Sequence, residues 1–120
     1  MLLKKRSNEI GFQVIIDFFY CDKTIIYDNK KVLQIIEQII SQMSITVVNK
    51  VIHEFEGQGL TACFVLKESH LIIHTWPESQ FLSLDMYTCC DDCEFDIKTI
   101  QEWLHSRKPR IKRVRHKKIN

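Results

Sequence analysis

The sequence predicts an α+β fold, an antiparallel sheet with two helices packed on one face as a two-layer sandwich. Segments rich in β-branched and aromatic residues outnumber helical segments, short turns join several of them, and each helical segment carries one apolar stripe. The chain has 120 residues, of which 45% are hydrophobic and 27% charged. This balance is typical of one globular domain, so we treat residues 1–120 as a single domain.

The first half of the chain predicts a strand, a helix and a hairpin. Residues 12–20 are rich in β-branched and aromatic side chains and predict a buried strand. Apolar residues then recur at helical spacing over Lys30–Met43, and their broad stripe suits packing on a sheet. Two further β-rich segments, 45–55 and 60–67, flank the turn at 56–59 and predict a hairpin.

The second half predicts two strands, a helix and a last strand. Segments 71–76 and 81–87 have strand composition and are joined by a short turn after Pro77. A helix is expected over 96–105, because its apolar residues share one face. Proline prevents the helix from extending past Pro109, and residues 110–116 alternate as a final strand.

Composition excludes several classes of protein. No apolar run approaches the roughly 20 residues of a membrane span, and the first residues lack the apolar stretch of a signal peptide. We therefore expect a cytoplasmic protein with no membrane contact. Its five cysteines are odd in number and Cys89 adjoins Cys90, so reduced thiols are expected rather than a disulfide framework.

Charge is unevenly distributed along the chain. Residues 1–102 hold nine Lys/Arg against 15 Asp/Glu, whereas residues 103–120 hold eight Lys/Arg and no acid. Such a basic end can contact phosphates or an acidic partner. No aromatic residue follows Trp103 to stack on a base, so we interpret the end as a solvated strand and expect no nucleic-acid partner.

Metal binding is one interpretation of the reactive side chains. His70 and His74 are four residues apart and can share a strand face, and Cys89 lies in the same half of the chain. A structural zinc site usually matches one close cysteine pair with a second, and here Cys90-x-x-Cys93 stands alone. We therefore expect no metal.

A hydrolase with a serine or cysteine nucleophile is a second interpretation. Ser69 lacks the Gly-x-Ser-x-Gly elbow, and no glycine-rich segment lies beside Cys89 to form an oxyanion hole. Nothing specific supports this interpretation, although the sequence alone leaves it open.

A third interpretation comes from resemblance. The chain contains Glu68-Ser69-His70-x-x-x-His74-Thr75-Trp76-Pro77-Glu78, followed by Asp85-x-x-Thr88-Cys89. Shorter matches lie upstream at Phe19-Tyr20-Cys21-Asp22, His53-x-Phe55 and Gly59-x-Thr61. In these segments the chain closely resembles the self-processing S-adenosylmethionine decarboxylases of bacteria and archaea, the short single-repeat class.

The resemblance implies that the proenzyme cuts its own backbone between Glu68 and Ser69. The Ser69 hydroxyl attacks the Glu68 carbonyl, and elimination from the resulting ester converts Ser69 into a pyruvoyl group. In the family the residue matching His74 removes the serine α-proton, and a hydroxyl matching Thr61 assists processing. On a straight strand Ser69 and His74 would face opposite sides, so these roles require a turn or kink at Ser69.

The products would be a β chain, 1–68, and an α chain, 69–120, that begins with the pyruvoyl cofactor. Its ketone forms a Schiff base with the substrate amine and is the electron sink for decarboxylation. By the family match, Cys89 protonates the substrate carbon, Phe55 stacks on the adenine ring and Glu78 binds the ribose hydroxyls. The implied product is the aminopropyl donor for spermidine biosynthesis.

Departures from the family pattern leave alternatives open. Cys90 replaces the usual glycine after the catalytic cysteine, Thr61-Ala62 stands where Ser-Gly is frequent, and a common early histidine is replaced around Phe12-Gln13. The scaffold could instead decarboxylate ornithine or arginine, or could be an unprocessed, non-catalytic homologue that serves as a binding or regulatory subunit. The resemblance also implies a homodimer in which both protomers shape each active site.

Overall fold

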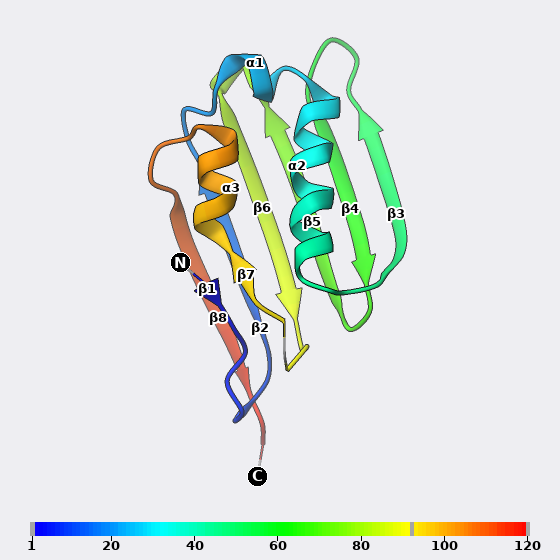
Figure 1. Ribbon diagram of the computed structural model, residues 1–120, viewed down its shortest axis with the longest axis vertical. Coiled ribbons are helices and arrows are strands. Elements are labelled where there is room, and N and C mark those ends of the chain that lie inside the picture. Colours follow the sequence, from blue (N-terminus) through cyan, green and yellow to red (C-terminus); the bar gives the residue numbers. More distant parts are fainter. Residues whose placement is uncertain (1, 92, 120) are drawn as a thin grey trace.

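The computed structural model describes residues 2–91 and 93–119, and they form a six-stranded sheet with helices on one side (Figure 1). The strand order is β3-β4-β5-β6-β2-β8, and every pair of neighbours is antiparallel. These strands are β2 (Glu9–Phe18), β3 (Val47–Glu54), β4 (Leu60–Leu66), β5 (Ser69–Trp76), β6 (Phe81–Thr88) and β8 (Arg110–Lys117). The predicted antiparallel α+β fold is therefore confirmed.

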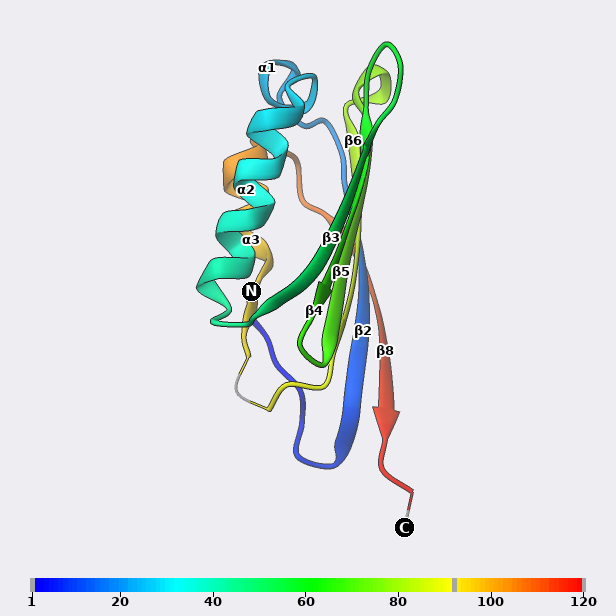
Figure 2. The same cartoon turned by 90° about the vertical axis from the view of Figure 1, so that its right-hand side faces the viewer.

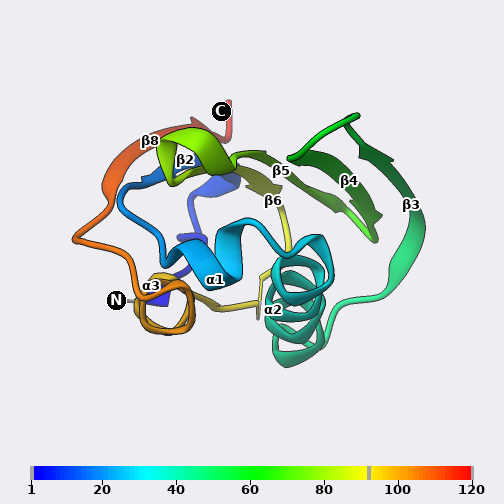
Figure 3. The same cartoon turned by 90° about the horizontal axis from the view of Figure 1, so that it is seen from above.

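The helices all lie on one face of the sheet, as Figures 2 and 3 show. They are α1 (Lys23–Ile26), α2 (Asn29–Gln42) and α3 (Ile97–Leu104). The two long ones begin at aspartate caps: Asp28 accepts from the first backbone N–H groups of α2, and Asp96 does so for α3. None of the helices within residues 2–91 and 93–119 combines the length and apolarity needed to cross a membrane.

Side-chain alternation determines which face of each strand is buried. In β4 the buried residues are Leu60, Ala62, Phe64 and Leu66, and in β5 and β6 every second residue is likewise buried beneath the helices. These side chains form one core with the apolar faces of α2 and α3. The residues at the alternate positions, His74 among them, lie on the opposite side, which we call the open face.

The open face carries apolar side chains that nothing in the described chain covers. Val51, Val65, Trp76 and Val114 lie on it by register and are exposed. An apolar patch of this kind is typical of a surface that contacts a partner. Figure 2 shows α1, α2 and α3 on the other side of the sheet.

The structure adds elements that the sequence patterns did not predict. β1 (Leu2–Leu3) pairs with β7 (Phe95–Asp96), and the single turn of α1 precedes α2. β2 also begins earlier than expected, and its pairing with β8 shifts register between Glu9 and Gly11. A Cβ at Gly11 would lie 2.6 Å from the Thr88 carbonyl oxygen, so this close approach requires glycine.

The expectation that all cysteines are reduced is wrong for one pair. Cys90 and Cys93 form a disulfide, whereas Cys21, Cys63 and Cys89 are free thiols. The loop after β6 turns back on itself and brings the two Cα atoms to 5.5 Å, a separation that suits a disulfide. Adjacency to Cys89 did not prevent the bond, because the partner of Cys90 is three residues away. Burial raises the pKa of the Cys21 thiol to about 11, which is consistent with a packing role.

Candidate active site

The Glu68–Ser69 peptide bond lies at the tight turn between β4 and β5. Leu66 pairs with Ser69, so Lys67 and Glu68 alone connect the two strands. Glu68 has φ of +64°, in the left-handed region that residues with a Cβ rarely adopt. This conformation costs roughly 1–2 kcal/mol, so the backbone is strained directly beside the bond.

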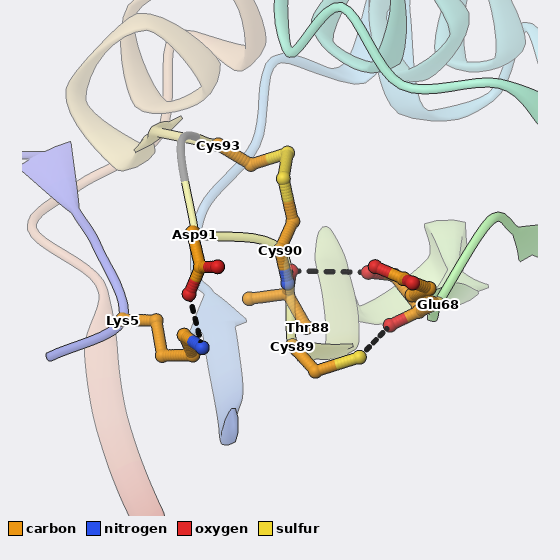
Figure 4. The surroundings of a disulfide bond; sticks show 8 residues. Lys5, Glu68, Thr88, Cys89, Cys90, Asp91 and Cys93 are labelled. Atoms are coloured by element: carbon orange, nitrogen blue, oxygen red, sulfur yellow. Dashed lines mark hydrogen bonds and ion pairs between the residues drawn. A yellow bond between two sulfur atoms is a disulfide. The ribbon is translucent and has the colours of Figure 1, made fainter. Parts of the chain in front are cut away.

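Cys89 holds the carbonyl group of this bond with two donors. Its backbone N–H donates to the Glu68 carbonyl oxygen at 3.3 Å, and its thiol donates to the same oxygen at 2.8 Å. Figure 4 shows the Cys89 side chain directed at Glu68. Two donors that converge on one carbonyl oxygen can stabilise the negative charge that develops there when a nucleophile attacks the carbon.

Ser69 is held in place by Thr88. The Ser69 hydroxyl donates to Thr88 Oγ1 at 3.0 Å, and the two residues face each other across β5 and β6. Thr88 is only 1% exposed, and its Oγ1 also accepts the backbone N–H of Cys90 at 3.2 Å. The potential nucleophile, the carbonyl it would attack and the donors to that carbonyl thus lie together at one end of the sheet.

A charged pair lies beside this group. Lys5 forms an ion pair with Asp91, on the loop that follows Cys89 (Figure 4). The hydrogen bond to Asp91 is the main cause of a raised pKa at Lys5, with smaller contributions from Cys89 and Glu68. The same bond lowers the pKa of Asp91. Lys5 is therefore held as a cation at the edge of the group.

A second group of candidates lies at the other end of the sheet. Thr61 Oγ1 and His74 Nδ1 are 2.9 Å apart across β4 and β5. They line a cavity of about 310 Å³, within the size range of ligand pockets. Glu78, on η1 (Pro77–Ser79), accepts a hydrogen bond from the Gln58 amide at 3.1 Å. The cavity is lined by Phe55, Gln58, Thr61, His74, Thr75, Trp76 and Glu78.

The two groups do not meet within one chain. β5 runs without interruption from Ser69 to Trp76, and five residues of strand separate Ser69 from His74, roughly 16 Å at the usual rise. The required turn is present, but it lies before Ser69 and does not bring His74 closer. Ser69 pairs with buried Thr88, whereas His74 occupies the open-face register. Figure 1 shows the β4–β5 and β3–β4 turns at opposite ends of the sheet.

Comparison with known proteins identifies the family. A model of the S-adenosylmethionine decarboxylase family matches residues 12–117. The chain belongs to this family. A decarboxylase proenzyme of Clostridium botulinum (strain Loch Maree) is 29% identical over 112 residues, covering 92% of this chain and 97% of the relative. A proenzyme of Thermosipho africanus is 36% identical over 85 residues, covering 71% of this chain and 65% of the relative.

A solved adenosylmethionine decarboxylase from Aquifex aeolicus shares the fold. Its TM-score is 0.80 at 20% sequence identity, and the alignment covers 95% of this chain and 96% of the other. This likeness supports the antiparallel sheet with its one-sided helices.

For an S-adenosylmethionine decarboxylase, the structure distributes the predicted site residues between two half-sites. One half-site holds Glu68, Ser69 and Cys89, and the other holds Phe55, Thr61, His74 and Glu78. Sequence reasoning placed Thr88 in a motif but gave it no role, and it overlooked Gln58. The alternation of buried residues along β6 could have identified Thr88, because it places this polar residue at a buried position, where its hydroxyl needs a hydrogen-bond partner.

Proposed function

We propose that this member of the family is a self-cleaving proenzyme that decarboxylates S-adenosylmethionine with a pyruvoyl group derived from Ser69. The observation that carries the proposal is the arrangement at the Glu68–Ser69 bond. A serine hydroxyl lies next to a carbonyl that already accepts two hydrogen bonds, in a strained turn. An ordinary strand serine does not require such donors on the preceding carbonyl.

The chain's own groups suit each cleavage step. The Ser69 oxygen would attack the Glu68 carbonyl carbon, and the N–H and S–H of Cys89 would stabilise the oxyanion. Breaking the C–N bond leaves an ester and a free amine. Removal of the Ser69 α-proton then expels the Glu68 carboxylate, and hydrolysis with loss of ammonia leaves the pyruvoyl group.

We further propose that two chains complete each active site. The base for the α-proton step, His74, belongs to the half-site at the far end of β5. A two-fold axis through the open face that sets the β5 strands of two copies antiparallel would bring the His74 end of one copy over the Ser69 end of the other, because such interfaces are self-complementary. Ser69 is the first residue of β5, directly beside the β4–β5 turn, so His74 of the other copy would approach it around that end of the sheet. The exposed apolar residues of that face support this assembly.

Substrate contacts follow from the second half-site. Phe55 leaves half of its surface exposed at the cavity and can stack on an adenine ring. Gln58 orients the Glu78 carboxylate, which can accept hydrogen bonds from both ribose hydroxyls.

The pyruvoyl group supplies the electron sink for loss of CO₂, and the Cys89 thiol can deliver a proton to the substrate carbon. Such an enzyme serves polyamine biosynthesis in the cytoplasm.

Intact mass under denaturing conditions tests self-cleavage directly. We expect two fragments, 1–68 and a pyruvoyl-blocked 69–120, and an uncut chain for Ser69→Ala. A single chain with an intact Ser69 would contradict the proposal and favour a non-catalytic homologue.

CO₂ release from S-adenosylmethionine, ornithine and arginine, each supplied alone to the cut enzyme, then identifies the substrate. Activity on an amino acid alone would contradict the nucleoside substrate.

A complementation experiment tests the shared site. Ser69→Ala chains should never cut, and His74→Ala chains should not cut when expressed alone. When the two are co-expressed, the His74→Ala chain should be cut, because the other copy supplies histidine. If co-expression restores no cutting although the two chains copurify, each site would lie within one chain.

A further inference from the structure

The Cys90–Cys93 disulfide lies directly beside the proposed cleavage site. It closes the loop between β6 and β7, and one of its ends follows Cys89 in sequence. Cys93 is 6% exposed and packs into the core, whereas Cys90 is only partly buried. The bond therefore ties the chain immediately after Cys89 to the rigid interior.

Hydrogen bonds connect this anchor to the reacting groups. The backbone N–H of Cys90 donates to Thr88 Oγ1, the atom that also holds the Ser69 hydroxyl. Cys89 lies between Thr88 and Cys90, and both its backbone N–H and its thiol donate to the Glu68 carbonyl oxygen. Fixing Cys90 thus fixes both the nucleophile and the oxyanion donors. Figure 4 shows the disulfide, Thr88, Cys89 and Glu68 side by side.

A disulfide in this position is well placed to make the neighbouring site sensitive to redox conditions. Disulfides in a reducing compartment are usually transient, catalytic or redox-sensing rather than structural. The Cys-x-x-Cys spacing is also common in thiol–disulfide exchange. Cys90 is the more exposed residue of the pair, and a reductant's thiolate could attack its sulfur first.

We propose that the Cys90–Cys93 pair is a redox-responsive site for dithiol reductants and that its oxidised form holds Thr88 and Cys89 in the geometry required for cleavage. The inference rests on the proposed function. Attack by one thiol of the reductant releases the Cys93 thiol and leaves a mixed disulfide on Cys90. The second thiol then releases Cys90, so two electrons and two protons pass to the protein and the reductant becomes a disulfide.

Reduction should slow self-cleavage because Cys90 gains freedom and its hydrogen bond to Thr88 weakens. The free energy of one such bond corresponds to a rate change of about two- to tenfold. Reduction should also slow decarboxylation by the cleaved enzyme, because Cys89, its proposed proton donor, loses its fixed position.

Cell-free translation in defined redox buffers tests the proposal, because cleavage can be followed as the full-length chain is made. Wild-type chain should cut about two- to tenfold faster with glutathione disulfide than with dithiothreitol. The double variant Cys90→Ser/Cys93→Ser should cut at the slower rate in both buffers. Cys63→Ser, which removes a free thiol outside the pair, is the matched control and should behave as wild type.

Several outcomes would overturn the proposal. A double variant that still responds to the buffer would assign the response to another thiol. Equal wild-type rates, with the pair shown by mass to be oxidised in one buffer and reduced in the other, would remove the link to cleavage. Failure of the pair to oxidise with glutathione disulfide would remove the site itself.

A second readout separates this proposal from failure of the proposed function. In full-length Ser69→Ala, which stays uncut, the alkylation rate of Cys89 can be measured by mass spectrometry before and after reduction of the pair. We expect at least about a twofold faster reaction after reduction, since the thiol loses its fixed partner on Glu68. If no chain cuts in either buffer, the proposed function fails. An unchanged Cys89 rate then overturns the redox proposal as well.

Discussion

Thr88→Val is the most informative single change, because valine keeps the shape of threonine and removes only the hydroxyl. That hydroxyl accepts the Cys90 N–H and holds Ser69, and it is almost fully buried. Leaving the Cys90 N–H without a partner should lower the free energy of unfolding by about 1–3 kcal/mol. Loss of the contact to Ser69 should cost about 1 kcal/mol in the cleavage step, or roughly a fivefold slower rate.

The assay is the time course of conversion to two fragments, followed by intact mass, alongside urea unfolding of uncut Ser69→Ala with and without Thr88→Val. Ile100→Val is the control. It removes a buried methyl group in α3 at a cost of about 1 kcal/mol and is not one of the candidate site residues. If Thr88→Val cuts at the wild-type rate, or if Ile100→Val slows cutting equally, Thr88 does not position the nucleophile.

Three further predictions rest on other contacts in the structure. Cys89→Ala keeps the N–H donor and loses the thiol donor to Glu68, so we expect cleavage about two- to tenfold slower and a much larger loss of CO₂ release; equal losses would contradict two separate roles. Asp96→Ala removes the cap of α3 and should lower the unfolding free energy by about 1 kcal/mol, measured by urea denaturation. Burial opposes ionisation of Glu9, but the Arg6 N–H and Arg115 hold its pKa below the ordinary 4.5. Its stabilisation is therefore present above pH 4.5 and lost as pH falls through the folded-state pKa, so Glu9→Gln should flatten the acid side of the stability curve.

Strong periodic patterns made most of the fold predictable. The predicted helix over Lys30–Met43 corresponds to α2 within one residue at each end, and the hairpin around the turn at 56–59 forms β3 and β4. The two-residue strands β1 and β7 escaped prediction because a pair that short has no period to detect. The disulfide was not predicted because the expected cytoplasmic location favours reduced thiols, whereas the Cys90-x-x-Cys93 spacing permits a bond. Only the path of the loop decides between the two.

The candidate site was predictable residue by residue but not in its arrangement. The motifs around Ser69 and Cys89 singled out these two residues as candidates, and the structure places Cys89 on the Glu68 carbonyl oxygen and Ser69 directly after it, held by Thr88. The family resemblance treats Ser69 and His74 as members of one site, whereas their spacing of five residues on a strand predicts opposite faces. Strand parity raised that difficulty, and only the register of β4, β5 and β6 shows how far apart the two groups lie.

The two edges of the sheet are chemically unlike, and this limits how copies of the chain can associate. β8 carries a row of lysines and arginines, so two such edges repel each other and cannot extend the sheet from one molecule to the next. β3, at the opposite edge, is exposed at every residue and presents valines and an isoleucine with a single lysine. At high concentration, disordered aggregation would therefore begin at β3, and a lysine substituted for Val48 there should raise solubility without touching either half-site.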